Sequence, residues 1–454
     1  MNNSDNERAL FEEMPVPKAI LTLAVPTIIS QIVTIIYNMA DTFFIGKLND
    51  PNQVAAATLA MPLFMFMTAL ANLFGVGGAS LISRLLGGGE RAKAARAGAF
   101  CIWSGAAAAF CYGILVLLLR PALLPVLGTD ADTYRLTSDY LFWTVCVGAV
   151  PTVLNPQLAH LIRAEGYSKQ ASFGVAFGGV LNIVLDPIFI YGFRLEITGA
   201  AVATLLSNAA AVAYFICFIQ KRSKTDVLTL SPKKYTLGEK IPAEVLSVGL
   251  PSFLISMMAT VSNTVLNHII AGYSNEAVAG MGIAKKVNLL AFAVAQGITQ
   301  GTLPLIGYNY TSGNKKRMTD TIRTLFAFAF AVSLVIAAVL YTEATGVTKL
   351  FIDDAATVGY GRDFLHIICC ACPMTTVTFF VLTVFQATGK KIQPIILSVL
   401  RKGAADVPFM FLFNARFGIN GAAWATPVAE VISVIVAAAM VIPYLKSLQK
   451  APNK

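Results

Sequence analysis

Twelve long apolar stretches, separated by short polar breaks, constrain this chain more than any other feature. They occupy residues 20–46, 54–83, 97–119, 140–161, 171–192, 198–219, 245–272, 277–306, 321–341, 364–385, 392–413 and 420–442. A helix needs roughly 20 mostly apolar residues to cross a bilayer, and every stretch reaches that length. Twelve buried helices of a water-soluble protein would leave too little polar surface, because only 13% of the 454 residues are charged and 56% are hydrophobic. The sequence therefore predicts an all-α integral membrane protein with twelve transmembrane helices.

The basic excess of the chain follows its predicted topology. The 34 Lys and Arg residues outnumber the 24 Asp and Glu residues, which gives a formal net charge of +10. If the N-terminus is cytoplasmic, 23 of the 34 fall in cytoplasmic loops, tails or the adjoining helix ends, 7 fall on the other side, and four lie deep within predicted spans. Cytoplasmic loops of membrane proteins carry such a surplus of Lys and Arg. We therefore expect a multi-pass protein of the cell membrane with both termini inside, and no nucleic-acid partner.

The chain contains an internal repeat. The stretch from Ile20 aligns with the stretch from Val245, which places Pro26 on Pro251, and residues 199–204 align with 421–426. The offset stays near 222–225 and spans six crossings, so the two halves are predicted to have the same orientation. We expect two pseudo-symmetric six-helix bundles related by an axis along the membrane normal.

These halves define the predicted domains. They are a cytoplasmic tail (1–14), an N-lobe (15–220), a cytoplasmic linker (221–240), a C-lobe (241–445) and a second tail (446–454). Repeats of this kind are typical of secondary transporters, in which one half rocks against the other around a central site. The chain has no Walker motif for ATP hydrolysis, so transport would depend on an ion gradient.

Three polar residues of the first half share a depth in the membrane, and a fourth lies one turn deeper. Asp41, Asp186 and Thr204 are each expected about 8–9 Å below the outer surface, and Asn182 lies one turn from Asp186 on the same helix face. A charge at this depth costs about 2.5–3.5 kcal/mol on insertion scales, which favours a functional role. Two carboxylates, an amide oxygen and a hydroxyl suit Na⁺, and a buried carboxylate pair can also hold a proton. The structural alternative is that Asp41 bonds a neighbouring helix and Asp186 caps a kink at Pro187.

The second half departs from this pattern. Asp186 aligns with Asp406, but Asp41 aligns with Leu266, and Lys402 lies four residues before Asp406. We hypothesise a C-lobe charge pair, formed by Arg401, Lys402 and Asp406, in which a covalently attached cation neutralises the carboxylate. The alternative is that both basic side chains extend to a membrane surface.

Several motifs together resemble one family. They are residues 37–46, which include Tyr37-Asn38 and Asp41, and residues 75–84, 163–166, 182–187 and 300–309. The chain resembles the multidrug and toxic compound extrusion (MATE) family over nearly its whole length. The sequences of its motifs are most similar to those of the bacterial DinF- or MepA-like branch. The resemblance implies twelve helices in two lobes around a V-shaped cleft, and Na⁺- or H⁺-driven export of amphipathic, often cationic, compounds.

The resemblance also implies site residues. The N-lobe cation site of the family maps onto Asp41, Asn182, Asp186 and Thr204, and a helix-1 hinge maps onto Pro26. NorM-like members carry a helix 7 glutamate where residues 257–259 read Met-Met-Ala, so a C-lobe cation site of that kind is not expected.

Other expectations follow for ligands and partners. Candidate residues of the substrate cavity are Tyr37, Asn38, Met61, Met65, Asn155, Asn263 and Lys285, although methionines on a helix can equally be core residues. We expect no catalytic residues, no metal beyond Na⁺, no cofactor beyond the coupling ion, contact with membrane lipid, and a monomer. The alternative functions are a flippase for lipid-linked or polysaccharide precursors and, less well supported, a membrane-embedded enzyme or receptor.

Overall fold

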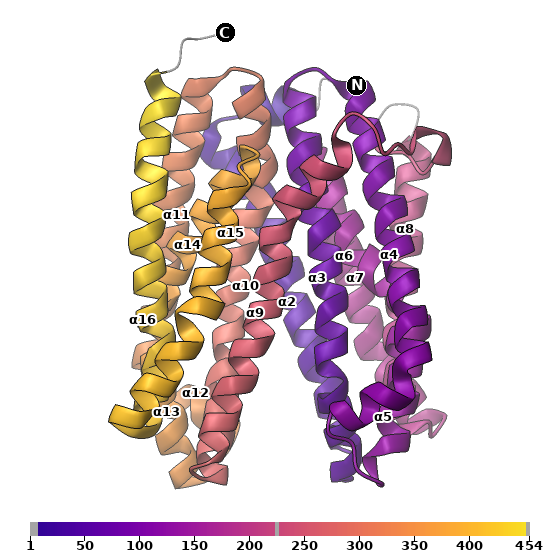
Figure 1. Cartoon of the computed structure of the whole chain (residues 1–454), viewed down its shortest axis with the longest axis vertical. Coiled ribbons are helices and arrows are strands. Elements are labelled where there is room, and N and C mark those ends of the chain that lie inside the picture. The colour runs from indigo at the N-terminus through magenta and orange to yellow at the C-terminus, as the bar shows by residue number, and fades with distance from the viewer. Residues whose placement is uncertain (1–7, 223–226, 451–454) are drawn as a thin grey trace. The chain divides into compact units, whose positions relative to one another are not determined.

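The computed structural model describes residues 8–222 and 227–450, and the regular elements of these residues are helices (Figure 1). In the first half they are η1 (Ala9–Glu13), α2 (Val16–Gly46), α3 (Pro51–Gly87), α4 (Arg91–Val126), α5 (Thr133–Leu141), η2 (Phe142–Val147), α6 (Ala149–Ala164), α7 (Ser168–Pro187), η3 (Ile188–Gly192) and α8 (Glu196–Arg222). In the second half they are η4 (Pro232–Lys234), α9 (Ile241–Ala271), α10 (Asn275–Thr311), α11 (Lys315–Thr342), α12 (Ala344–Lys349), α13 (Ala355–Cys369), α14 (Cys372–Ala387), α15 (Ile392–Val399), η5 (Leu400–Ala404) and α16 (Asp406–Lys450). The all-α fold class is confirmed.

The membrane spans agree with the predicted stretches. Within the described residues, ten helices are long and apolar enough to cross a membrane, and the bent pair formed by Thr133–Val147 and Ala149–Ala164 makes up to eleven. One of the ten, Ile392–Leu448, is 57 residues long and contains two predicted spans. The backbone between them is non-helical at Gly418 (φ 65°, ψ −150°), so the element consists of two helices joined at a kink. Counting it as two gives the twelve predicted crossings.

The predicted span 140–161 is not one straight helix. It bends by 51° where η2 meets α6, at Gly148. A side chain there would approach the carbonyl oxygens of Thr144 and Trp143, so the bend requires glycine. Pro151 follows in the first turn of α6, where its missing N–H costs no helical hydrogen bond. The length of the apolar stretch predicted the membrane crossing but not the bend at Gly148.

Polar side chains fix the starts of several helices. Asp50, Ser274, Asn314 and Asp354 each accept a hydrogen bond from a backbone N–H in the first turn of α3, α10, α11 and α13. Such caps satisfy backbone donors that a helix start leaves free. The N–H and the hydroxyl of Thr357 both donate to the Asp354 carboxylate, and these bonds lower the pKa of Asp354.

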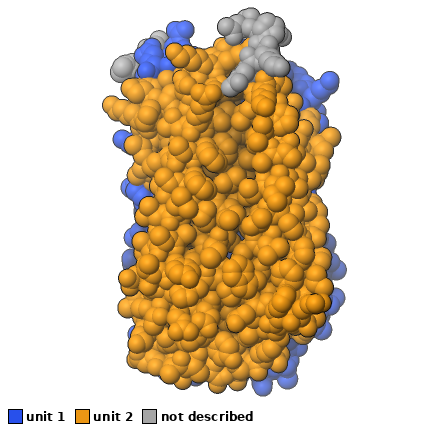
Figure 2. Space-filling view, turned by 90° about the vertical axis from the view of Figure 1, so that its left-hand side faces the viewer, with its two compact units in different colours: residues 1–13, 29–256 blue, residues 14–28, 257–454 orange. Residues whose placement is uncertain are grey.

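The chain forms two compact units, which Figure 2 distinguishes by colour. Unit 1 comprises residues 1–13 and 29–256, and unit 2 comprises residues 14–28 and 257–454. These are not the same segments as the predicted lobes 15–220 and 241–445. The beginning of α2 belongs with the later helices, and the beginning of α9 belongs with the earlier ones.

Glycines permit both of these placements. In unit 2, a side chain at Gly297 of α10 would lie 2.7 Å from the Cα of Ile28 in α2. In unit 1, a side chain at Gly249 of α9 would clash with the backbone of Leu73 in α3. The backbones therefore touch at both places, where only glycine fits. Because α2 and α9 are repeat equivalents, the exchange of helix beginnings is itself part of the internal symmetry.

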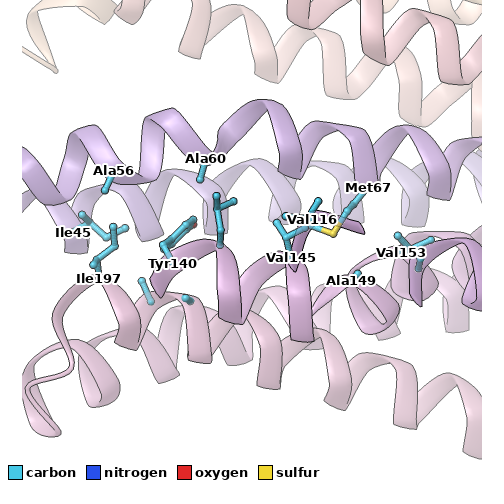
Figure 3. Close-up of a cluster of buried hydrophobic side chains, with 14 of the residues drawn as sticks. Ile45, Ala56, Ala60, Met67, Val116, Tyr140, Val145, Ala149, Val153 and Ile197 are labelled. Atoms are coloured by element: carbon cyan, nitrogen blue, oxygen red, sulfur yellow. The ribbon is translucent and has the colours of Figure 1, made fainter. Parts of the chain in front are cut away.

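Each unit has its own apolar core. In unit 1, side chains from α3, α4, η2, α6 and α8 surround Met67 and Val145, and the cluster extends past Tyr140 toward Ile45 and Ile197 (Figure 3). In unit 2, a second cluster joins α9, α10, α13 and α16 around Phe364 and Met410. The polar residues considered next lie beside these cores.

Candidate functional site

The four predicted cation-site residues belong to three helices of unit 1. Asp41 is on α2, Asn182 and Asp186 are on α7, and Thr204 is on α8. The amide nitrogen of Asn182 donates to Asp186 Oδ1 at 3.3 Å and approaches Thr204 Oγ1 at 3.4 Å. Asp186 is completely buried, and Asn182 is 1% exposed. The structure therefore brings the α7 and α8 members into direct contact.

Three oxygens of this group are open, in the sense that they accept no hydrogen bond from a described residue. Asp41 Oδ1, Asn182 Oδ1 and Asp186 Oδ2 are buried and have no hydrogen-bond partner within the described residues. Asp41 is linked to this group through Thr204, because both residues line one pocket. A buried acceptor without a partner costs about 1–3 kcal/mol. A hard cation or a proton would satisfy these oxygens, which is the chemistry expected of a Na⁺ or H⁺ site.

A small pocket opens onto this group. It has a volume of about 60 Å³, and its lining includes Asp41, Thr204, Asn38, Met61 and Tyr140. A water molecule needs about 10–15 Å³ by this measure, so the pocket has room for several waters. Asp41 thus contributes both to the oxygen group and to an accessible space.

The backbone around Asp186 is irregular. Pro187 ends α7 directly after Asp186, and the π-helical segment η3 follows. Proline removes a backbone donor and disrupts the regular helical pattern. Single π-helical turns are frequent at functional sites. The local sequence therefore explains why the helix is irregular beside the carboxylate.

The other predicted cavity residues are dispersed. Asn38 and Met61 line the pocket, whereas Tyr37 packs against Gly179 of α7. Met65 is half-buried and lines no described pocket. Asn155 of α6 donates to the side chain of Asn208 at 2.8 Å.

Two predicted cavity residues and the predicted hinge lie elsewhere. Asn263 is exposed on α9, and Lys285 of α10 donates to Asn267 Oδ1 at 2.8 Å in unit 2. Pro26 lies inside α2, two residues before the boundary between the units.

In the second half, the group equivalent to this site contains the positive charge of a lysine side chain, Lys402. Lys402 Nζ lies 3.2 Å from Asp406 Oδ2, and that oxygen also accepts from Ser262 Oγ at 2.7 Å. Thr426 Oγ1, the repeat equivalent of Thr204, donates to Asp406 Oδ1 at 2.9 Å. An ammonium thus occupies the place beside this aspartate where the N-lobe has an amide.

Arg401 is separated from this arrangement. Sequence reasoning grouped it with Lys402 and Asp406, but its Nε lies 2.6 Å from Glu430 Oε1. Arg401 is 2% exposed, so it does not extend to a membrane surface. The two charged pairs are therefore Lys402–Asp406 and Arg401–Glu430.

Removal of Lys402 tests the first of these pairs. Lys402→Ala should lower the thermal unfolding midpoint in detergent, because it leaves buried Asp406 without its countercharge at a cost of about 3–5 kcal/mol. Lys402→Ala combined with Asp406→Ala should recover most of that loss. If the double variant is as unstable as the single variant, charge neutralisation is not the role of Lys402.

Sequence reasoning missed three contributors. Tyr140 lines the pocket beside Asp41, although its position at the outer end of a predicted span gave no sign of this. Ser262 bonds Asp406 from another helix, and hydroxyls are too common within spans to identify it. Glu430 lies within a predicted span, so its buried charge can be recognised from the sequence, but its pairing with Arg401 cannot.

The chain is similar to known proteins over nearly its whole length. The MatE family model matches residues 26–188 and 251–412. The multidrug export protein MepA of Staphylococcus aureus is 32% identical over 441 residues, which cover 97% of this chain and 96% of that protein. MepA of Staphylococcus saprophyticus is also 32% identical, over 445 residues.

Solved structures of transporters have a similar fold over nearly the whole chain. A crystal structure of a MATE protein in complex with MaL6 has a TM-score of 0.91 at 25% identity, covering 98% of this chain and 99% of that one. A MOP superfamily transporter from Pyrococcus furiosus, described as having a binding pocket of reverse polarity, has a TM-score of 0.90 at 25% identity, with the same coverage.

Proposed function

Because this chain belongs to the MatE family of multidrug export transporters, we propose that it exports amphipathic organic cations across the cell membrane in exchange for Na⁺ or H⁺. The observation that carries this proposal is the group of three open, buried oxygens on Asp41, Asn182 and Asp186. Both coupling ions are cations that such oxygens bind. Substrates would be small molecules, and the protein would act as a monomer in contact with lipid.

The position of Asp41 suggests how coupling works. Its carboxylate adjoins both the ion-binding oxygens and the pocket that contains Asn38 and Met61. A negative Asp41 attracts a cationic substrate, whereas binding of Na⁺ or a proton neutralises it and weakens that attraction. The two cations therefore compete for one charge, which is the requirement for exchange by alternating access.

The orientation belongs to the same proposal. The bias of 23 Lys and Arg residues against 7 supports cytoplasmic termini, and hence the cell membrane as the location. In that orientation Asp41 and Asp186 lie toward the outer end of their helices. An inward ion gradient would therefore reach this group from the outside.

A flippase for lipid-linked or polysaccharide precursors would be expected to have a more cationic cavity in the second half. Lys402 is paired with Asp406 and Arg401 with Glu430, so each of these pairs is electrically neutral. They reduce the positive charge available to attract a polyanionic lipid precursor, whereas Lys285, which donates to the neutral amide of Asn267, keeps its charge. The multidrug exporter is therefore the better-supported function.

Transport by reconstituted protein tests the proposal. Proteoliposomes should move ethidium, a fluorescent amphipathic cation, under an imposed Na⁺ or pH gradient, because the open oxygens couple the two cations. The two gradients are applied separately, and the one that drives movement identifies the coupling ion. Protein-free liposomes are the control, and movement no faster than theirs under both gradients would contradict the proposed function.

A further inference from the structure

A second cavity lies wholly within unit 2. It is enclosed by α10, α11, α13, α14, η5 and α16, has a volume of about 70 Å³, and shares no lining residue with the pocket beside Asp41. That volume exceeds the 10–15 Å³ needed for one water several-fold, so the cavity has room for a ligand of several non-hydrogen atoms. Its walls combine apolar side chains, including Phe292, Ile298 and Val332, with three charged ones.

Two of the charged side chains are almost completely buried and incompletely bonded. Arg401 Nε binds Glu430 Oε1 at 2.6 Å, and the guanidinium packs 4.4 Å from the centre of the Phe379 ring. Nevertheless, Arg401 Nη1 and Glu430 Oε2 have no hydrogen-bond partner among the residues that the structure describes. A hydrogen bond to a charged group contributes about 1.5–3 kcal/mol of free energy. A ligand that supplies the missing partner would therefore bind more tightly.

Two cationic side chains supply free donors on the wall. The hydroxyls of Ser333, Thr376 and Thr426 already donate to Phe330 O, Cys372 O and Asp406 Oδ1. The other N–H donors belong to the neutral amide of Asn288, to Arg401, and to Lys402, which has one bond to Asp406. Each cation is neutralised by one carboxylate, so the cavity has no net positive charge for a polyanion, but its charged N–H groups can bind one strong acceptor, such as a single carboxylate.

The backbone positions these two cations. Arg401 and Lys402 both belong to η5, a π-helical turn that interrupts the span between α15 and α16. Single π-helical turns are frequent at functional sites. In this case the turn lets neighbouring residues serve different carboxylates while both line one cavity.

We propose that this cavity is a binding site for small organic carboxylates with an apolar body. The ligand carboxylate accepts from Arg401 Nη1, and its ring lies against Phe292 and the aliphatic wall. Glu430 keeps the guanidinium in place and balances its charge when the site is empty. The site is independent of the proposed cation site, because the two cavities share no residue.

Equilibrium dialysis of radiolabelled benzoate against the purified full-length protein tests this site. Benzoate should bind saturably, whereas benzamide and benzylamine, which match its size but lack the anionic acceptor, should compete at least about tenfold less well. Ala329→Phe should abolish binding by filling the cavity with a ring. Ala331→Phe, on the exposed face of the same helix, is the matched control and should bind normally.

Two further variants keep the test decisive. Arg401→Lys retains the positive charge beside Glu430 but removes Nη1, and should weaken benzoate binding about tenfold. Asp41→Asn should leave benzoate binding unchanged, so failure of the proposed transport function and failure of this site are distinguishable. Absence of saturable binding, undiminished binding by Ala329→Phe or Arg401→Lys, or equal competition by benzylamine would each overturn the proposal.

Discussion

Asp41→Asn should strongly reduce gradient-driven export of an organic cation while leaving the protein folded. The substitution keeps the size of the side chain but removes the negative charge that, in our proposal, attracts both the substrate and the coupling ion. A hydrogen bond to a charged group contributes about 1.5–3 kcal/mol, and 1.4 kcal/mol corresponds to a factor of ten. We therefore expect the rate of ethidium movement to fall by at least about tenfold.

The measurement is ethidium movement in proteoliposomes under the gradient that drives the wild type. Asp186→Asn should show the same loss, because Asp186 supplies another open oxygen of the group. Asp353→Asn, which removes a carboxylate from an exposed segment before α13, is the matched control and should transport normally. Undiminished export by Asp41→Asn with an intact folding transition would rule out the cation-site assignment.

Glu430→Gln should produce a large loss of stability. Glu430 is 1% exposed and is the partner of the fully enclosed Arg401 guanidinium. Removal of one member of a buried ion pair costs about 3–5 kcal/mol, because the other charge stays buried without compensation. The thermal unfolding midpoint in detergent should therefore fall strongly, with Arg401→Met giving a similar loss.

The double variant separates charge from packing. Arg401→Met combined with Glu430→Met removes both charges, and replacement of a buried pair by apolar side chains is often neutral or stabilising. Its midpoint should return close to that of the wild type. Asp363→Asn is the surface control, since its pair with Arg362 is largely exposed and such pairs contribute at most about 1 kcal/mol. A double variant as unstable as Glu430→Gln would show that the charges themselves are not the cause.

The candidate site was partly predictable because burial in lipid makes charge rare. Asp41 and Asp186 stood out as carboxylates within predicted spans, and the cost of placing them there indicated function before any geometry was known. Asn182 and Thr204 could be added by depth and helix face. Tyr140 could not, because a tyrosine near the end of a span is common at the membrane interface.

The ion pairs of the second half show where such reasoning stops. Arg401 and Lys402 are adjacent, and their side chains leave a helix about 100° apart, so they cannot be expected to share one partner. Which acidic residue each meets depends on the packing of α14 and α16 against η5. Sequence spacing pairs Lys402 with Asp406 and groups Arg401 with them, and only the structure assigns Arg401 to Glu430.

The sequence by itself determined the number of crossings, their common order in two halves and the family. It could do so because lipid imposes a minimum apolar length on each span and requires its backbone to be satisfied by helical hydrogen bonds. Only the tertiary structure decided that residues 14–28 join the later helices, that 241–256 join the earlier ones, and that Arg401 meets Glu430. These outcomes depend on close packing between helices distant in sequence, including backbone contacts at Gly249 and Gly297, which apolar periodicity does not encode.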